Sequence, residues 1–210
     1  LADEKNISIK FIHVSSEGKL DLDHLKELLK LNPKIVAFTH MSNVLGTINP
    51  AKEIIDLSHD AGAIVIVDGA QSVPHFSVSI DELDADFYAF SAHKMCGPTG
   101  IGILFGKKSL LEDMPPFLGG GDMIKKVTFT DFSTNEIPYK FEAGTPAIAQ
   151  AIGFGAAVDY LSNIGMENIF AHEKILTEYA LEILPDIPGL QILGPDASEK
   201  GGVISFTLQD

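Results

Sequence analysis

The sequence predicts an α/β fold in which a mostly parallel sheet carries helices on both faces. Four short apolar runs have the length of strands, and each is continuous, as in strands that are buried on both sides. The runs are 35–39, 64–67, 87–90 and 101–105. Between the first two runs, Pro50 and Gly62 are the start and stop residues of a helix over residues 50–61. Strands that alternate with helices are typical of a parallel sheet.

The next elements follow from periodicity and turn-forming residues. Residues 7–14 alternate apolar and polar side chains, which predicts a half-buried strand. Asp21 or Asp23 can cap a helix of helically spaced leucines that ends before Pro33. The segment 115–145 is rich in Pro, Gly and Thr and lacks periodicity, which predicts an irregular segment with a functional role.

The last third of the chain predicts a second domain. Helices are expected at 146–161 and 167–184, and strands at 190–193 and 203–208. We therefore assign residues 1–160 to a large domain and residues 161–210 to the start of a small α/β C-terminal domain. Because the chain begins without Met and ends in a strand-like run, we expect the large domain to be incomplete at its N-terminus and the small one to be truncated.

Composition argues against several classes of function. The net charge is -14 and all 15 basic residues are lysine, which argues against nucleic-acid binding. No apolar run reaches the roughly 20 residues that cross a membrane, so we expect no membrane association. The single cysteine, Cys96, indicates a reducing compartment, the cytoplasm or an organelle of a eukaryote, and is interpreted as a small buried side chain. The histidines show no metal-ligand spacing, so no metal site is predicted.

The strongest functional signal follows the apolar run 87–90. Lys94 stands just past this run, where burial disfavours the ammonium form and a neutral amine can form an imine with a carbonyl. Asp68 ends the run AIVIVD, where its carboxylate can keep a pyridine nitrogen protonated. Together they predict a pyridoxal-phosphate site, although each residue alone also fits an ordinary surface lysine or a turn-capping aspartate.

Four further residues are candidate cofactor ligands. Ser91 and His93 lie on a sharp turn that can hold a phosphate, while Asn43 and Gln71 can donate to the phenolate oxygen of the cofactor. For each of these taken alone, local turn bonding is the simpler interpretation. Ligands of such sheets bind beyond the carboxyl ends of the strands, so we expect Asn43 on the same edge as the lysine and the aspartate.

Five ordered motifs resemble the SufS-type (group II) cysteine desulfurases, which are class V aminotransferases and fold-type-I pyridoxal-phosphate enzymes. The motifs are FTHMSNVLGTINP, VDGAQSVPH, FSAHKMCGPTGIGILFGKKSLL, MPPFLGGGDMI and FEAGTPAIAQAIGFGAAVDYL. The resemblance implies that the large domain binds the cofactor, with Lys94 as the imine-forming residue and Asp68 as the partner of the pyridine nitrogen. It implies that Gln71 and Asn43 lie near the phenolate oxygen. Thr145, in AGTP, would reach the phosphate of the other subunit in a homodimer.

The resemblance also implies an activity. These enzymes convert L-cysteine to L-alanine and pass an enzyme persulfide to an acceptor protein, of the Suf or a similar system, for iron–sulfur cluster assembly. Their persulfide-forming cysteine and carboxylate-binding arginine have no counterpart among these residues, so we expect this chain alone to be inactive. Cys96 does not occupy the place of that nucleophile, and Lys140 stands where many relatives have Arg.

Two alternatives stay open at this point. One is a selenocysteine lyase or another class V pyridoxal-phosphate enzyme, which would use the same Lys94 and Asp68. The other is a non-catalytic scaffold homologue that binds sulfur-transfer partners. The presence of both residues weighs against the scaffold, which needs neither.

Overall fold

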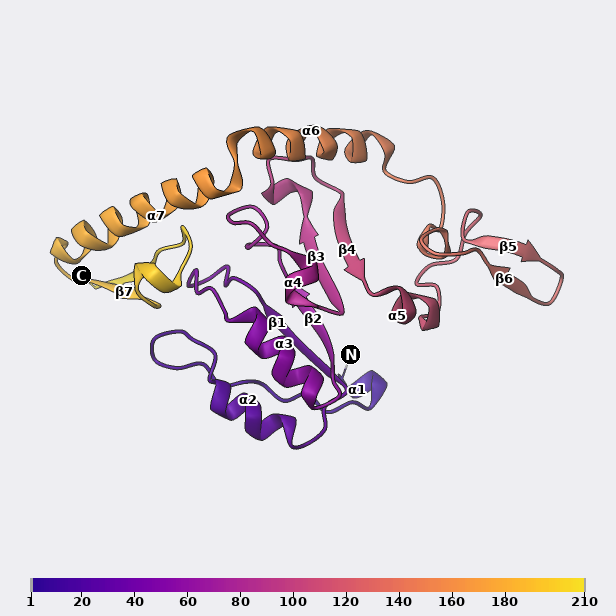
Figure 1. Cartoon of the computed structure of the whole chain (residues 1–210), viewed down its shortest axis with the longest axis horizontal. Helices are drawn as coiled ribbons and strands as arrows, with labels where there is room; N and C mark the ends of the chain where they lie inside the picture. The colour runs from indigo at the N-terminus through magenta and orange to yellow at the C-terminus, as the bar shows by residue number, and fades with distance from the viewer. Residues whose placement is uncertain (1, 210) are drawn as a thin grey trace.

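The computed structural model describes residues 2–209 (Figure 1). The α-helices are α1 (Ala2–Lys5), α2 (Leu22–Leu29), α3 (Ala51–Asp60), α4 (Ile80–Leu83), α5 (Lys108–Asp113), α6 (Ile148–Ile164) and α7 (Met166–Ile183). The strands are β1 (Ile35–Thr39), β2 (Ile64–Asp68), β3 (Phe87–Ser91), β4 (Gly102–Gly106), β5 (Ile124–Val127), β6 (Phe132–Thr134), β7 (Leu190–Leu193) and β8 (Ser205–Leu208). Short 3-10 helices lie at η1 (Ala92–Lys94), η2 (Tyr139–Phe141), η3 (Leu184–Asp186) and η4 (Ala197–Glu199).

The central sheet has four strands in the order β1-β2-β3-β4. The first three run parallel, and β4 returns antiparallel to β3. The register pairs Thr39 with Asp68 and Asp68 with Ala89, so the parallel strands end at a common edge. The predicted α/β fold with a mostly parallel sheet is confirmed, and each central strand begins and ends within one residue of its prediction.

The two faces of this sheet are covered unequally. On one face, side chains such as Val36 and Phe38 are buried in a core with residues of α2 and α3; α3 lies across β1 and β2, and α2 lies beside α3 (Figure 1). On the other face, α5 approaches β4, where Leu111 lies over Gly106. Farther along this face Ile35 is 56% exposed. Residues 2–209 therefore leave part of the apolar surface of β1 uncovered.

Two predictions were wrong: a strand over residues 7–14, and a wholly irregular segment over residues 115–145. Residues 7–14 are mostly exposed and form no strand, and of these residues only Val14 makes a β-bridge, to Leu20. Alternation alone cannot hold a strand that lacks a neighbouring ladder. The segment 115–145 contains an antiparallel hairpin of β5 and β6, closed by the N–H of Thr128 donating to the carbonyl of Asp131 at 2.8 Å.

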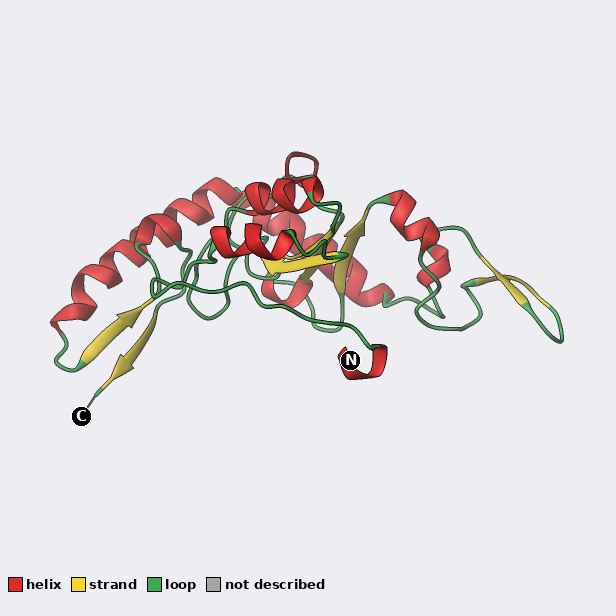
Figure 2. Cartoon of the chain, turned by 90° about the horizontal axis from the view of Figure 1, so that it is seen from below, coloured by secondary structure: helices red, strands yellow, loops and turns green. Residues whose placement is uncertain are grey.

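The C-terminal third is built from two consecutive long helices and a hairpin. Helix α6 ends at Ile164, and Gly165, with φ +88°, turns the chain into α7. The predicted boundary at residue 160 therefore falls inside α6, and the division into two domains stays a prediction. In Figure 2 the β7–β8 hairpin lies at one end of the molecule and the β5–β6 hairpin at the other.

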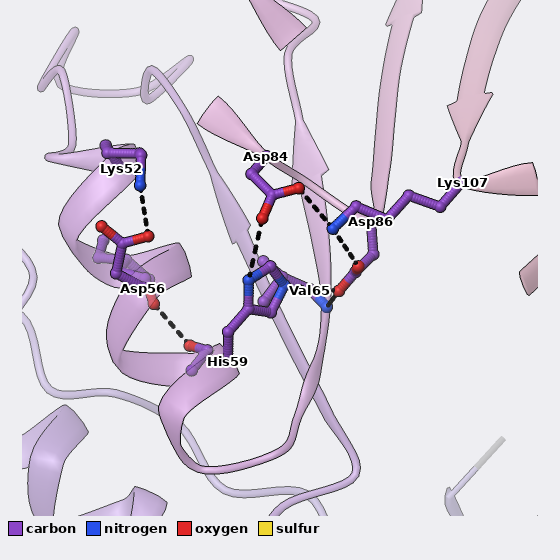
Figure 3. Close-up of polar contacts among 9 residues, drawn as sticks. Lys52, Asp56, His59, Val65, Asp84, Asp86 and Lys107 are labelled. Atoms are coloured by element: carbon purple, nitrogen blue, oxygen red, sulfur yellow. Dashed lines mark hydrogen bonds and ion pairs between the residues drawn. The ribbon is translucent and has the colours of Figure 1, made fainter. Parts of the chain in front are cut away.

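A buried carboxylate fixes the sheet at the edge where β2 and β3 begin. The N–H of Val65 donates to Oδ2 of Asp86 at 2.7 Å, and Nε2 of His59 lies 2.9 Å from the same oxygen. The ammonium of Lys107 lies 3.0 Å from Asp86 and 2.7 Å from Asp84 (Figure 3). This network ties α3 to β2, β3 and β4. A lysine ammonium, an imidazole and a backbone N–H therefore surround a carboxylate that would otherwise be costly to bury.

Candidate active site

Three of the predicted residues follow the carboxyl ends of three adjacent strands. Asp68 is the last residue of β2, Asn43 comes four residues after β1, and Lys94 ends the 3-10 helix η1 after β3. Because β1, β2 and β3 are parallel neighbours, these positions share one edge of the sheet. This is the edge where open α/β sheets bind their ligands.

Asp68 is held by the backbone and presents a carboxylate to solvent. Its Oδ1 accepts a hydrogen bond from the N–H of Ala70 at 2.8 Å, and its carbonyl accepts one from the N–H of His40 at 2.8 Å. Its Oδ2 has no hydrogen-bond donor among the described residues. An oriented carboxylate with an open oxygen suits a cationic N–H donor.

Lys94 lies on a tight turn. The N–H groups of Met95 and Gly97 both donate to the carbonyl of Ala92, and a Cβ on Gly97 would come within 2.8 Å of that oxygen. The ammonium of Lys94 is exposed and makes no ion pair with any residue in the described chain. The expectation that Lys94 is buried at the strand end is therefore wrong for residues 2–209, where Lys94 is exposed.

The other predicted ligands divide into two groups. Ser91, His93 and Gln71 lie on the turns that begin at this edge, and Ser91 and Gln71 are half-buried. Thr145 is exposed and precedes α6, at the end of that helix nearer the β5–β6 hairpin (Figure 1). Among residues 2–209, no hydrogen bond joins Thr145 to the turns at the strand ends.

Cys96 is exposed, so its interpretation as a buried side chain was wrong. It has φ +59°, a left-handed conformation that turns the chain after η1. Among residues 2–209, no three His, Cys, Asp or Glu side chains gather closely enough to hold a metal ion. Within the same residues, no helix combines the length and apolar character needed to cross a membrane.

Sequence reasoning missed a buried polar chain beneath the Asp68 turn. Nδ1 of His40 lies 2.9 Å from the hydroxyl of Tyr88, which lies 2.6 Å from Oγ of Ser72. Burial lowers the pKa of His40 to about 4. Burial also raises the pKa of Tyr88 to about 12, and the negative charge of Asp68 adds to that rise. The available signal was a tyrosine inside an otherwise apolar strand run.

The C-terminal part of the chain braces two of the site turns. The N–H of Gly201 donates to the carbonyl of Gly46 at 2.9 Å, within the loop that carries Asn43. Nδ1 of His75, on the turn after β2, lies 2.7 Å from a carboxylate oxygen of Glu173 in α7. The positions of both turns therefore depend on elements more than 90 residues away in sequence.

This fold has close counterparts among known proteins. Residues 1–210 match the family described as aminotransferase class-V. The chain belongs to the class V aminotransferase family. Its class V relatives include a protein named cysteine desulfurase from Haloferax volcanii, which is 50% identical over 208 residues, covering 99% of this chain and 49% of that protein. A probable cysteine desulfurase from Staphylococcus epidermidis is 51% identical over 210 residues, 100% of this chain and 51% of that protein.

Solved structures confirm the fold. The apo cysteine desulfurase of Thermococcus onnurineus superposes with a TM-score of 0.94 at 37% identity, covering 99% of this chain and 52% of that one. The cysteine desulfurase CsdA of Escherichia coli gives 0.93 at 37% identity, with 99% and 51% covered. A mutant of C-DES, with glycine covalently linked to its PLP cofactor, gives 0.86 at 25% identity, with 99% and 56% covered.

These comparisons confirm two of the predictions made from the sequence. The fold is that of the fold-type-I enzymes, and pyridoxal phosphate is the cofactor of this class V group. The chain spans about half the length of the curated relatives it matches. The roles of the individual site residues in this chain stay predictions.

Proposed function

We propose that the full-length class V protein is a pyridoxal-phosphate-dependent cysteine desulfurase, which converts L-cysteine to L-alanine and transfers the sulfur to an enzyme thiol. One observation carries the proposal: Lys94 and Asp68 follow the carboxyl ends of the adjacent strands β3 and β2, in a chain about 50% identical to proteins of that name. An imine-forming amine beside an oriented carboxylate is the arrangement that pyridoxal phosphate requires.

The donor set of this edge fits the cofactor. Oδ2 of Asp68 can accept the N–H of a protonated pyridine, since Oδ1 is already bound to the backbone. Ser91 and His93 offer a hydroxyl and a ring nitrogen to a phosphate, and Gln71 offers an amide to the phenolate oxygen. The exposed amine of Lys94 has no competing partner among residues 2–209.

Each side chain then has a definite task. When bound, pyridoxal phosphate supplies an electron sink for the bonds at the α-carbon of the substrate. Nζ of Lys94 would hold the cofactor and would take the proton from the α-carbon of the substrate as a general base. Asp68 would keep a proton on the pyridine nitrogen, and Asn43 would donate a hydrogen bond to the phenolate oxygen.

We further propose that the protein is of the SufS type and supplies sulfur for iron–sulfur cluster assembly through an acceptor protein. The ordered motifs that resemble this group support the assignment. The exposure of Thr145 fits a homodimer in which its hydroxyl reaches the partner's phosphate. A single cysteine fits a reducing compartment, and we propose the cytoplasm.

The test is an absorbance spectrum together with product analysis of the full-length protein. After incubation with pyridoxal phosphate and dialysis, a visible imine band is expected, and Lys94→Ala should lose it. With L-cysteine, the protein should release alanine and carry a persulfide, and Lys94→Ala should release neither. A colourless full-length protein that makes no alanine would support the scaffold, and turnover of selenocysteine alone would support the lyase.

The isolated 210-residue chain provides a further check. It contains no arginine and only the exposed Cys96 as a thiol. We propose that it releases no alanine from L-cysteine, because a substrate carboxylate has no guanidinium to bind. Alanine release by the isolated chain would contradict this part of the proposal.

A further inference from the structure

Tyr88 lies beneath the turn that follows Asp68. Its side chain is fully buried in the core of the sheet, in β3. The ring occupies the space next to Gly69, where a Cβ would come within 1.9 Å of Cε1. The N–H of Gly69 donates to the carbonyl of Ala89, the neighbour of Tyr88, at 2.7 Å. The first residue of the turn is therefore held against both the backbone and the ring of β3.

The hydroxyl of Tyr88 closes a circuit of hydrogen bonds around Asp68. On one side, it lies 2.9 Å from the ring of His40, whose backbone N–H donates to the carbonyl of Asp68 at 2.8 Å. On the other side, it lies 2.6 Å from the hydroxyl of Ser72, which donates to the carbonyl of Gly69 at 3.1 Å. The circuit thus returns to the residue after Asp68, and it joins the loop after β1 to the turn after β2.

We assign the direction of each proton by counting donors. Because the hydroxyl of Ser72 donates to Gly69, its oxygen must accept the proton of Tyr88. The oxygen of Tyr88 then accepts from Nδ1–H of His40. A neutral His40 ring carries a single N–H, and this circuit places it on Nδ1. Each donor of the circuit is therefore used once.

We propose that Tyr88 is a positioning residue for Asp68: through its hydroxyl it sets the Asp68–Ser72 turn so that the carboxylate meets the pyridine nitrogen. The inference rests on the proposed function, since it needs Asp68 as the partner of that nitrogen. A phenylalanine would fill the same volume without burying a hydroxyl. Burial of a hydroxyl is unfavourable unless its hydrogen bonds are made, and here those bonds end on the turn that carries Asp68.

The test is Tyr88→Phe in the full-length protein, because the change removes one oxygen and keeps the ring under Gly69. We expect the dissociation constant for pyridoxal phosphate to rise about tenfold and the visible circular dichroism of the bound cofactor to change. Ser72→Ala should shift both measurements in the same direction, and the double variant should lose less than the sum of the two single losses, because the two variants share the Tyr88–Ser72 hydrogen bond. Tyr139→Phe, at a tyrosine 60% exposed, is the matched control and should behave as the wild type.

The outcomes separate this inference from the proposed function. If Asp68→Asn also weakens cofactor binding and Tyr88→Phe stays within twofold of the wild type, the positioning role is wrong while the role of Asp68 stands. Additive losses in the double variant would likewise overturn the shared hydrogen bond. If Asp68→Asn leaves both the affinity and the spectrum unchanged, the proposed role of Asp68 fails, and with it the reason for a positioning residue.

Discussion

Gly69 lies directly against the ring of Tyr88, so that a Cβ on Gly69 would come within 1.9 Å of Cε1 and 2.5 Å of the hydroxyl oxygen. The ring is buried in the core and cannot move aside cheaply. We expect Gly69→Ala to lower the free energy of unfolding by about 3 kcal/mol, the upper end for overpacking. Urea denaturation of the full-length protein measures this.

A matched substitution separates this clash from a general effect of alanine. Gly155 lies within α6, and a Cβ there would meet nothing within 4 Å. Gly155→Ala should raise the free energy of unfolding by about 0.5–1 kcal/mol, because alanine favours a helix. Equal effects of the two substitutions would contradict the proposed contact with Tyr88.

Asp86 couples stability to pH. Burial acts to raise its pKa, but hydrogen bonds from the N–H of Val65, then from His59 and Lys107, place the pKa of Asp86 below its ordinary value. Such a carboxylate stabilises the fold above its unfolded pKa of about 4, and this contribution is lost as the pH falls through the folded pKa. We expect Asp86→Asn to lower the free energy of unfolding by about 2 kcal/mol at pH 7, and less at lower pH.

Urea denaturation of both proteins at pH 7 and at about pH 3 tests this expectation. The difference between wild type and Asp86→Asn should shrink at the lower pH. Asp159→Asn, at an exposed position of α6, is the control and should change stability little at either pH. A deficit of equal size at both pH values would show that the charge of Asp86 is not what stabilises the network.

Lys140 caps the end of α5. Its buried side chain donates from Nζ to the carbonyl of Glu112 at 2.7 Å and to that of Leu111 at 3.2 Å. A cation there satisfies carbonyls that a helix end leaves unpaired. We expect Lys140→Met to lower the free energy of unfolding by about 1.5 kcal/mol and Lys140→Arg to restore most of it. Thermal and urea denaturation measure both, and an unchanged Met variant would argue against the cap.

The contact between His75 and Glu173 holds the Gln71 turn against α7. The two side chains lie 2.7 Å apart and are each about one-quarter exposed. We expect Glu173→Ala to speed hydrogen exchange of residues 70–78 about fivefold, which corresponds to roughly 1 kcal/mol of local opening. Glu178→Ala, at an exposed position farther along the same helix, should leave that exchange unchanged. Equal exchange rates of residues 70–78 in the two variants would contradict this role of the His75–Glu173 contact.

The elements predicted well are those whose signal is local. The strands β1 to β4 are short apolar runs with turn residues at their ends, and their place in the sheet follows from the helices between them. Residues 7–14 carry a strand pattern but no strand, because pairing depends on a neighbouring chain that the pattern does not encode. The hairpin of β5 and β6 was missed because polar residues, such as the two consecutive lysines of β5, interrupt the alternation of apolar and polar side chains that marks a strand.

The site shows the same division. The sequence by itself determined which chemical groups are present: the amine of Lys94, the carboxylate of Asp68, and the strand ends that carry them to one edge. Only the tertiary structure showed that Lys94 is exposed, and that His40, Tyr88 and Ser72 form one circuit. These residues lie 48 and 16 positions apart, so no periodicity or spacing relates them. Their hydrogen bonds exist because the packing of β1, β2 and β3 brings buried polar groups together where water cannot satisfy them.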